Sequence, residues 1–540
     1  MENTQNRKLA VAAIIVMTST VLSRILGFIR TTLITNIHYL NVNDKDALFM
    51  SFAITDVMFF LLVGGSIASV LIPMLSRYIS NGDEKNGWRA VSSFINIMFI
   101  AITVFSILGE IFAPQLISLV APGFGKEKAE LTVQVTRIMF PSVSFIMLTG
   151  LLNGVLYSYH RYVAAAYGTL SYNVFCIISI IVFSRYGVKM VAVGIMCSSI
   201  LYFLFQLTFT LKNLKLYRPK IYLKDPGLKK LVLLSIPSLI ASSIAQINIL
   251  VSQSYNSYFP DGSVTALRNA TDIWQMPYGI FALGLGVAIL PSLSEMLAKN
   301  DMDSYRSTLV KSLKSMLLLI IPSAVGLAVL GVPATSVIYK WSARMSASTI
   351  NITSTMLMFF SIALVSQSIV AIVNRAFYAN NDTKTPLYIG ASSIALNAIL
   401  CFGFFKLTNL SASGMALAFS ISSAIYALLL LWYLNRKVGG LKLRNLLNFS
   451  IRVFGAALVM AVILFVINKL IPVDFTQKFT LKHKILELVI IAAEIGFGFM
   501  IFMAAAIRLK IEEAVYLYNA IISKMKGLLG RTKVKEIGKM

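Results

Sequence analysis

Charged residues placed inside long apolar runs are the part of this sequence that could do chemistry. A charge inside a membrane span is costly, so by default it marks a functional site. The basic examples are Arg24, Arg30, Arg137, Arg268, Arg375 and Arg452, and the acidic examples are Asp56, Glu110, Asp272, Glu487 and Glu494. Arginine offers a planar fork of donors that suits phosphate oxygens. These residues predict a partly cationic cavity for an anionic head group such as a diphosphate.

These charged residues differ in where they lie along the apolar runs. Arg137, Arg452 and Glu487 lie near run ends, where we expect their side chains to extend toward water. Arg268 and Asp272 are one helical turn apart and share a face. The predicted substrate-binding cavity is lined by Arg24, Arg30, Asp56, Arg268, Asp272 and Arg375. A structural ion-pair network that holds the two halves of the protein together is the alternative for this group.

For Glu110 and Glu494 the alternative is pairing with neighbouring helices. Glu494 lies in the middle of its run and has no partner nearby in the sequence, so a position facing a groove is a second interpretation for it. The short acidic segment Asp44-Lys-Asp46 reads as turn chemistry.

The elements that carry these residues are predicted to be membrane spans. The chain has 540 residues, of which 57% are hydrophobic and 13% charged, and this excludes a soluble enzyme, a disulfide scaffold and a disordered protein. A span needs about 20 mostly apolar residues. Fourteen segments qualify: 9–37, 47–75, 90–120, 131–158, 162–184, 190–211, 229–256, 265–297, 312–338, 347–378, 384–405, 411–434, 447–469 and 485–507. We predict an all-α polytopic membrane protein.

Charge sets the predicted orientation. With both termini in the cytoplasm, about 30 of the 48 Lys and Arg residues fall on the cytoplasmic side and about 12 in outer loops. The formal net charge of +26 therefore suits an anionic inner leaflet, and we expect membrane lipids and no nucleic acid as partners. The segment Met1–Lys8 leads into an uncleaved first span. The tail after Arg508 predicts a basic amphipathic helix over 511–529 on the inner leaflet.

The sequence carries no enzyme signature. The three cysteines lie in apolar runs and the three histidines are far apart, which predicts no disulfide framework and no metal site. Patterns for nucleotide, zinc or serine chemistry are absent from the sequence. We expect no catalytic residue and no cofactor.

An internal repeat with an offset of about 220 residues organises the predicted spans. Its paired segments are Thr55-Asp56 with Thr271-Asp272, Ile72–Ser76 with Leu290–Ser294, Asn153–Tyr157 with Asn374–Tyr378, Asn173 with Asn397, and Ala192–Gly194 with Ala412–Gly414. Two parallel six-helix bundles form a transporter architecture, with the binding site at their interface. The predicted parts are an N-terminal lobe (1–224, spans 1–6), a C-terminal lobe (225–440, spans 7–12), two appended spans (441–507) and the basic tail (508–540).

Several segments resemble the MurJ (MviN) family of lipid II flippases, which belongs to the multidrug/oligosaccharidyl-lipid/polysaccharide exporter superfamily. They are Ser23–Arg30, Asp46–Phe49, Ala121–Phe124, Gln246–Asn248, Gly262–Val264, Pro277 with Gly279, Leu290-Pro291 and Arg375–Pro386. The resemblance covers spans 1–12 and includes the family's count of fourteen spans.

The resemblance implies that the chain moves undecaprenyl-diphosphate-linked disaccharide-pentapeptide across the bacterial cytoplasmic membrane for peptidoglycan synthesis. Alternating access of the two lobes would do the work, Arg24 and Arg30 would be cavity arginines, and spans 13 and 14 would hold the polyprenyl tail. Membrane lipids and cell-wall synthesis proteins are the further partners it implies.

The sequence departs from the family's charge pattern. Phe59, Phe60 and Gly64 stand where the family usually has an arginine pair and a glutamate, and Thr31 replaces an aspartate. The usual Asp-Arg pair and Glu of span 8 are Thr271, Asp272 and Gln275 here. Spans 7 and 11 contain no Asp or Glu, which counts against sodium coupling.

These departures leave alternatives open. A flippase for another polyprenyl-linked glycan is the first, and a cation-coupled drug exporter, which would use Asp56 with Phe59 and Phe60, is the second. A membrane glycosyltransferase and a transport-inactive scaffold are the others. The two appended spans favour the flippase, since such exporters usually stop at twelve spans.

Overall fold

The computed structural model describes residues 2–61, 70–342, 347–380, 382–470, 473–477, 479–519 and 523. Within these residues the structure is helical and contains no strand. The helices are α1 (Glu2–Asn36), α2 (Val42–Phe59), α3 (Ile72–Ser80), α4 (Glu84–Ile111), α5 (Ala113–Val120), α6 (Lys126–Ser158), α7 (Tyr162–Phe183), η3 (Ser184–Tyr186), α8 (Val188–Thr210), η4 (Leu214–Leu216), α9 (Pro226–Asn256), α10 (Ser263–Pro277), η5 (Tyr278–Leu283), α11 (Gly284–Ala298), α12 (Met302–Val329), α13 (Gly331–Tyr339), α14 (Ala347–Ala379), α15 (Lys384–Leu407), α16 (Ser413–Lys437), α17 (Leu443–Leu470) and α18 (Leu481–Arg508).

The chain is an all-helical, multi-pass membrane protein. Eleven helical segments among the described residues are long and apolar enough to cross a membrane: α4, α6, α7 with η3, α8, α10 through α11, α12, and each helix from α14 to α18. Of the other three predicted segments, α1 and α9 cover two, and α2 covers the first part of 47–75, whose residues 62–69 lie outside the described residues. None of these three helices is among the eleven. The count of fourteen spans therefore stays a prediction. Of the predicted tail helix, residues 512–519 are helical, and most of the remainder lies outside the described residues.

Local sequence explains where several helices begin and bend. Asn41 and Asp44 form a reciprocal capping box at the start of α2. Asp44 therefore has the local, turn-forming role that the sequence predicts for it. Asp225 caps α9 just before Pro226, and Thr480 caps α18. Pro277 ends α10, and the π-helical segment η5 carries the chain on into α11.

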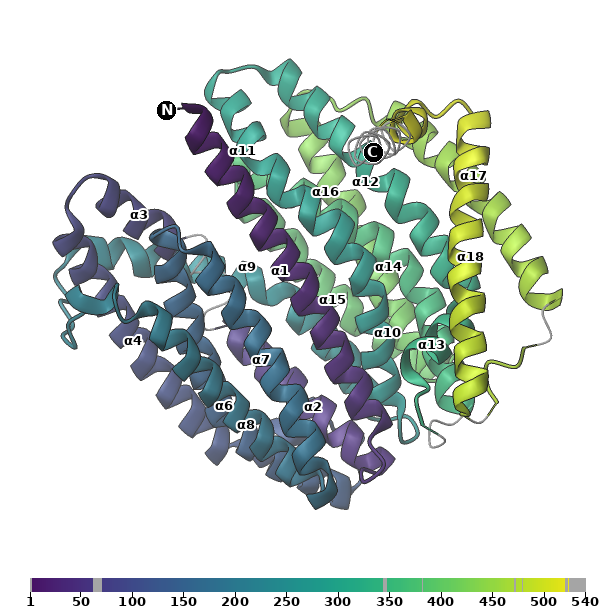
Figure 1. The fold of residues 1–540 in the computed structure, drawn as a ribbon, viewed down its shortest axis with the longest axis horizontal. Coiled ribbons are helices and arrows are strands. Elements are labelled where there is room, and N and C mark those ends of the chain that lie inside the picture. The colour runs from purple at the N-terminus through teal and green to yellow at the C-terminus, as the bar shows by residue number, and fades with distance from the viewer. Residues whose placement is uncertain are drawn as a thin grey trace, which may run out of the picture. The chain divides into compact units, whose positions relative to one another are not determined.

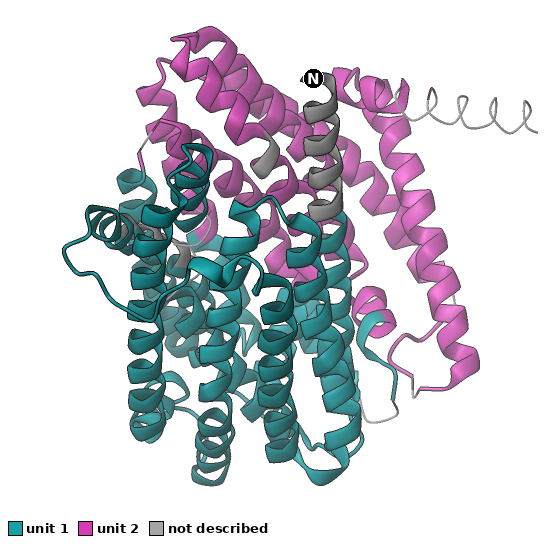
Figure 2. Ribbon diagram, turned by 60° about the vertical axis from the view of Figure 1, so that its left-hand side comes forward, with its two compact units in different colours: residues 1–272, 338–356, 383–422 teal, residues 273–337, 357–382, 423–540 magenta. Residues whose placement is uncertain are grey.

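The helices form two compact units, each built from three stretches of chain (Figure 2). Unit 1 comprises Met1–Asp272, Ile338–Met356 and Thr383–Ser422. Unit 2 comprises Ile273–Val337, Leu357–Asp382 and Ser423–Met540. The unit boundaries fall within α10, α13, α14 and α16, and between α14 and α15.

Unit 1 is built around α6, which packs against α8, α2 and α4, while α1 lies along α7 (Figure 1). Buried apolar side chains such as Trp88 and Phe140 fill the space between these helices. At the ends of α4 and α6, Trp88 Nε1 donates to the Tyr159 hydroxyl at 2.8 Å, and that hydroxyl donates to Glu84. Burial, and then the hydrogen bond to the Glu84 carboxylate, raise the pKa of Tyr159 to about 12.

Unit 2 contains α12, α17 and α18 packed side by side. A buried charge network joins the start of α18 to α13. Lys484 Nζ donates to the Ser336 carbonyl at 2.7 Å and lies 3.3 Å from Glu487 Oε2, which also accepts from Ser336 Oγ at 3.1 Å. His483 Nε2 lies 3.3 Å from Glu487 Oε1.

The prediction that Glu487 extends toward water is wrong, because its side chain has no exposed surface and is surrounded by these partners. Arg137 and Arg452 do lie on the surface as predicted.

Replacing Glu487 with leucine should lower the stability of the protein sharply. The change leaves the buried Lys484 without its carboxylate, and breaking a buried pair costs about 3–5 kcal/mol. The double variant Lys484→Met/Glu487→Leu removes both charges and should recover most of the loss. The measurement is the thermal unfolding midpoint of the full chain in detergent. Equal midpoints for the single variant and the wild type would contradict this account.

Candidate functional site

Arg268 is the centre of a charge cluster inside unit 1. Its Nη1 lies 3.5 Å from Asp56 Oδ2 on α2, and its Nε lies 3.3 Å from Asp272 Oδ1 one turn further along α10. The predicted pairing of Arg268 with Asp272 is confirmed. The contact with Asp56 joins residues 212 positions apart in the chain and could not be read from helical spacing.

Arg30 on α1 adds a second guanidinium to this cluster. The charges of Arg268 and Asp56 act on it, and its Cζ lies 5.4 Å from the Phe52 ring centre and 5.9 Å from that of Tyr172. Aromatic faces attract a cation without using its N–H donors. The buried Nε of Arg30 has no hydrogen-bond partner within the described part of the chain. A guanidinium with an unused buried donor is suited to donate a hydrogen bond to an anionic oxygen.

Two small residues of the Ser23–Arg30 segment, Ser23 and Gly27, let α1 pack against α7. Asn173 Nδ2 on α7 donates to Ser23 Oγ at 3.0 Å, and the space beside Gly27 is occupied by the same asparagine. A close approach of two helices in a membrane depends on such small residues. This contact orients α1, which carries Arg24, a half-buried side chain, and Arg30.

Tyr339 is a member of the cluster that the sequence did not reveal. It is fully buried, and both Arg268 and Asp272 act on it electrostatically. Its hydroxyl donates to the Asn269 carbonyl at 3.3 Å, and its ring lies 5.5 Å from that of Phe28. An aromatic residue at the end of an apolar segment gives no sequence signal for such a role, because its contacts come from other parts of the chain.

The cluster is partly open to solvent and formally balanced in charge. The Asp56 side chain keeps 46% of its surface exposed, compared with 18% for Arg268 and 18% for Asp272. Arg30 and Arg268 cancel the two aspartates. These four residues therefore carry no net charge together.

Arg375 has its contacts in unit 2. Its side chain lies beside Gly286 of α11, close to where a Cβ on that glycine would stand, and its charge acts on Tyr378. The ion pairs of Arg268 and the ring contacts of Arg30 described above do not involve it.

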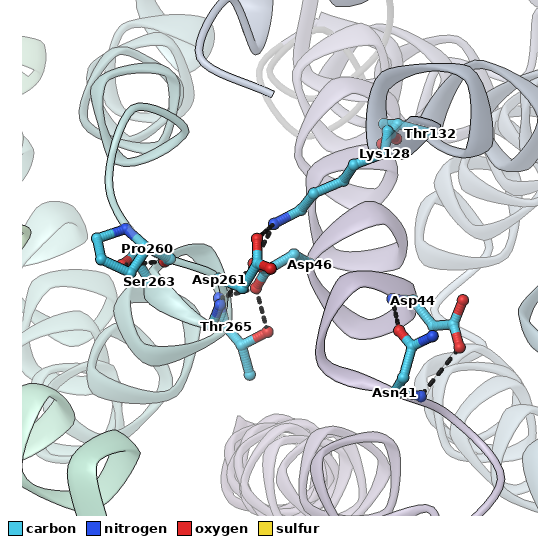
Figure 3. Close-up of polar contacts among 10 residues, drawn as sticks. Asn41, Asp44, Asp46, Lys128, Thr132, Pro260, Asp261, Ser263 and Thr265 are labelled. Carbon is cyan, nitrogen blue, oxygen red and sulfur yellow. Dashed lines mark hydrogen bonds and ion pairs between the residues drawn. The ribbon is translucent and has the colours of Figure 1, made fainter. Parts of the chain in front are cut away.

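A second polar network joins the starts of α2, α6 and α10 (Figure 3). Asp46 is 1% exposed and accepts four hydrogen bonds. Its Oδ2 accepts from Lys128 Nζ at 2.7 Å and from the Gly262 N–H at 2.8 Å, and its Oδ1 accepts from the Thr265 N–H at 2.9 Å and Oγ1 at 2.6 Å. Lys128 also contacts Asp261 Oδ1 at 3.0 Å.

The turn interpretation of Asp46 is therefore wrong, although it holds for Asp44. Asp46 lies one turn inside α2 and directly before the buried run Ala47–Met50, so a carboxylate there must be paired. The backbone N–H groups it binds belong to the start of α10, where a helix leaves donors unsatisfied and favours negative charge. The apolar run after Asp46 was the signal in the sequence that could have indicated this role.

No group of three or more His, Cys, Asp or Glu side chains that could hold a metal ion occurs within the described ranges. The cluster and the Asp46 network thus offer charge pairing and hydrogen bonding.

Two solved structures show which fold this is. One described as "Lipid II flippase MurJ, inward closed conformation" matches with a TM-score of 0.74 over 94% of this chain and 100% of that chain, at 23% identity. One described as the inward-facing conformation of a multidrug resistance MATE family transporter of the MOP superfamily matches with a TM-score of 0.66, over 80% and 99%, at 14% identity. The chain has the helical fold that these transporters share.

Sequence comparison shows to which family within this fold the chain belongs. The family model "Lipid II flippase MurJ" matches residues 42–485. A probable lipid II flippase MurJ of Rickettsia prowazekii (strain Madrid E) is 29% identical over 508 residues, which cover 93% of this chain and 97% of the relative. The lipid II flippase MurJ of Burkholderia cenocepacia is 27% identical, over 82% and 87%. The chain belongs to the MurJ family of lipid II flippases.

Replacing Asp46 with asparagine should loosen the junction of α2, α6 and α10. The amide keeps the shape but loses the ion pair with Lys128 and one acceptor. We expect a cysteine at Ser51, which is buried on α2 one turn deeper than Asp46, to react roughly tenfold faster with a membrane-impermeant maleimide. The background replaces Cys176, Cys197 and Cys401 with alanine.

Asp44→Asn is the matched control, because it removes a charge from the same turn of α2 but only from an exposed cap. Equal labelling rates in the two variants would contradict the role assigned to Asp46.

Proposed function

We propose that this chain moves lipid II, the polyprenyl-diphosphate-linked peptidoglycan precursor, from the inner to the outer leaflet of the bacterial cytoplasmic membrane. The observation that carries the proposal is the Arg30–Arg268–Asp56–Asp272 cluster, in a chain whose family model covers residues 42–485. Lipid II presents a diphosphate, and arginine forks bind phosphate oxygens in pairs. The family's role in peptidoglycan synthesis supports the same assignment.

Each residue of the proposed cavity has a role in this mechanism. Arg30 offers its unused buried Nε donor to a diphosphate oxygen. Arg268 is held by Asp56 and Asp272 when no substrate is bound, and a diphosphate competes with these carboxylates for the same guanidinium. Asp56, the most exposed of the three, is the partner that gives way most readily. Arg24 and Arg375 would supply the excess positive charge that the four-residue cluster lacks.

Release of the Asp46 network is the proposed step that opens the outer end of the transporter. The loops 37–41, 121–125 and 257–262 are all outer loops in the predicted orientation, and Asp46, Lys128, Asp261 and Thr265 lie at or just after them. Alternating access requires contacts at one end that can break when the other end closes. An ion pair with hydrogen bonds to a helix start is a directional contact, so it can separate without exposing a large apolar surface.

The remaining architecture belongs to the same proposal. It comprises fourteen spans, a lobe over 1–224, a second parallel lobe over 225–440, two appended spans over 441–507 for the polyprenyl tail, and a basic tail over 508–540. Both termini lie in the cytoplasm. The chain acts by transport without catalysis, with the lipid-linked oligosaccharide, membrane lipids and cell-wall synthesis proteins as its partners.

A different polyprenyl-linked glycan is the second candidate substrate. The family's usual arginine pair and glutamate in span 2 are absent here, and the cluster is formally neutral. A cation-coupled drug exporter is the weaker alternative. It is supported by the MATE-like structural neighbour and by the 46% exposure of Asp56 beside apolar residues.

Complementation tests the function directly. The chain is expressed in a bacterium depleted of its own lipid II flippase, and growth and lipid II exposure on the outer leaflet are measured. The wild type should rescue growth. Arg30→Ala and Arg268→Ala should each reduce lipid II exposure roughly tenfold or more, because each removes a charged donor to the diphosphate.

Two further variants separate binding from structure. Arg137→Ala, on the helix surface, should rescue like the wild type. The triple variant Arg268→Ala/Asp56→Asn/Asp272→Asn removes Arg268 together with both carboxylates that pair with it, and should regain stability without regaining transport. Rescue by that triple variant would show that Arg268 only clamps the two aspartates. Failure of the wild type, despite confirmed membrane expression, would favour another glycan or a drug substrate.

A further inference from the structure

Unit 1 contains a cavity of about 480 Å³ between α3 and the start of α9. Cavities that bind small molecules usually measure about 300–1,000 Å³. The described residues that line it include none of the residues that the proposed transport mechanism assigns to the substrate. The proposed function therefore leaves this cavity without a role.

Close helix contacts fix the walls of this cavity. A Cβ on Gly227, at the start of α9, would lie 2.9 Å from Ala90 Cβ on α4 and 2.7 Å from Met74 Cε on α3. A Cβ on Gly87 of α4 would lie 2.6 Å from Tyr78 Cβ on α3. Carbon atoms do not pack so closely, so the two glycines are what allows α3, α4 and α9 to meet here.

The chain that leads into α9 is also held in place. The Tyr222 N–H donates to Ser93 Oγ on α4 at 3.0 Å. Asn96 Nδ2, one turn further along α4, donates to the Lys220 carbonyl at 3.2 Å. The start of α9, with Lys230 in it, is therefore positioned by bonds to α4.

Two cations from different helices line the cavity. Arg77 belongs to the last turn of α3, and Lys230 follows the first turn of α9. Tyr78 and Asn81 add a hydroxyl and an amide to the lining. The described lining residues include no Asp or Glu, and the stretch 62–69 contains neither of them in its sequence. The lining is therefore cationic.

The acidic residues next to the lining in the chain have partners elsewhere. Asp225 Oδ1 accepts from the Gly227 N–H at 2.9 Å, and its Oδ2 lies 3.5 Å from Arg89 Nε. Asp83 accepts from Asn86 Nδ2 at 3.0 Å. Neither carboxylate lines the cavity, so an anion that enters it meets two cations.

The charged and apolar parts of the lining together indicate the kind of anion. The planar fork of Arg77 suits two oxygens of one phosphate, and the ammonium group of Lys230 adds a point charge. Val70, Pro73 and Pro226 supply apolar surface, which inorganic phosphate would leave unused. The lining therefore suits a phosphate ester, whose organic part lies against these apolar residues.

We propose that this cavity binds an anionic phosphate ester, with Arg77 and Lys230 pairing with the phosphate oxygens. In the predicted orientation the loops 81–83 and 211–225 are cytoplasmic. The ester is then either the head group of a phospholipid in the inner leaflet or a soluble molecule of the cytoplasm. That position rests on the orientation given in the proposed function, whereas the phosphate chemistry does not.

Protection of a cysteine from labelling tests the site in the full chain. The background replaces Cys176, Cys197 and Cys401 with alanine, and Met74→Cys places a thiol in the lining. The chain is held in nanodiscs of zwitterionic lipid, which leave both faces accessible to a water-soluble maleimide. The probes are sn-glycerol 3-phosphate and dihexanoylphosphatidylglycerol. Glycerol and dihexanoylphosphatidylcholine are their matched controls without net negative charge.

We expect a phosphate probe to slow the labelling saturably, at a concentration roughly tenfold lower than its matched control requires. Ser80→Cys, in place of Met74→Cys, gives the control position, because Ser80 is an exposed residue of α3 outside the lining. Its labelling should be the same with and without each probe.

Variants assign the site. Lys230→Gln and Arg77→Gln should each raise the half-protecting concentration roughly tenfold. Lys229→Gln removes the same charge from the neighbouring exposed residue outside the lining, and should change that concentration less than about twofold. Equal labelling rates without a probe show that the variants keep the packing around Met74.

The two phosphate probes distinguish the sources of the ester. Protection by dihexanoylphosphatidylglycerol alone assigns the site to a lipid head group, and protection by sn-glycerol 3-phosphate alone assigns it to a soluble ester. Protection by both shows that the phosphate itself is recognised. Each of these results supports the proposal.

Three outcomes would overturn it. The first is protection by the matched controls at the same concentrations as the phosphate probes. The second is protection that both Lys230→Gln and Arg77→Gln leave unchanged. The third is the absence of protection by either phosphate probe, although the thiol at position 74 is labelled. None of these outcomes bears on lipid II transport, which complementation measures separately.

Discussion

A charge that folding removes from water must be compensated inside the protein, and this requirement organises unit 1. Asp46 shows it most clearly, because one buried carboxylate accepts donors from Lys128 on α6 and from Gly262 and Thr265 at the start of α10. Three segments far apart in the chain must meet for that carboxylate to be satisfied. The junction therefore sets where α2, α6 and α10 begin relative to one another, and these helices carry Asp56 and Arg268 toward each other.

The same requirement explains how the cluster can both hold a structure and bind a substrate. Arg268 is compensated by two carboxylates, one of which is nearly half exposed. Such a pair is cheaper to break than a fully buried one, because water already screens it in part. Arg30 is compensated differently, because aromatic rings lie beside its guanidinium, and its Nε has no hydrogen-bond partner within the described ranges. The partly exposed Arg268–Asp56 pair and the unused Nε donor of Arg30 suit a transporter, which must bind an anion and release it again.

Unit 2 shows both extremes of charge compensation along one helix. At the start of α18, Lys484, His483 and Ser336 surround Glu487, and the network holds that helix to α13. Two turns later Glu494 lines an apolar cavity, and its carboxylate has no hydrogen-bond partner among the residues that the structure describes. The carboxylate of Glu487 holds α18 against α13. The carboxylate of Glu494 could take a hydrogen bond from a ligand.

Sequence alone determined the class of protein and much of its local chemistry, because hydropathy, helical period and capping act over neighbouring residues. The all-helical membrane class, the segments that became helices, the Arg268–Asp272 turn and the isolation of Glu494 were all predictable in this way. Only the tertiary structure decided that Asp56 joins the ion pair of Arg268 and Asp272, and that Tyr339 lies beside it. It also decided that Asp46 is buried where three helices meet, and that Glu487 is enclosed by its partners. Most of these contacts join residues of different helices, many of them far apart in the chain, and side-chain pairing at such separations leaves no periodic trace in the sequence.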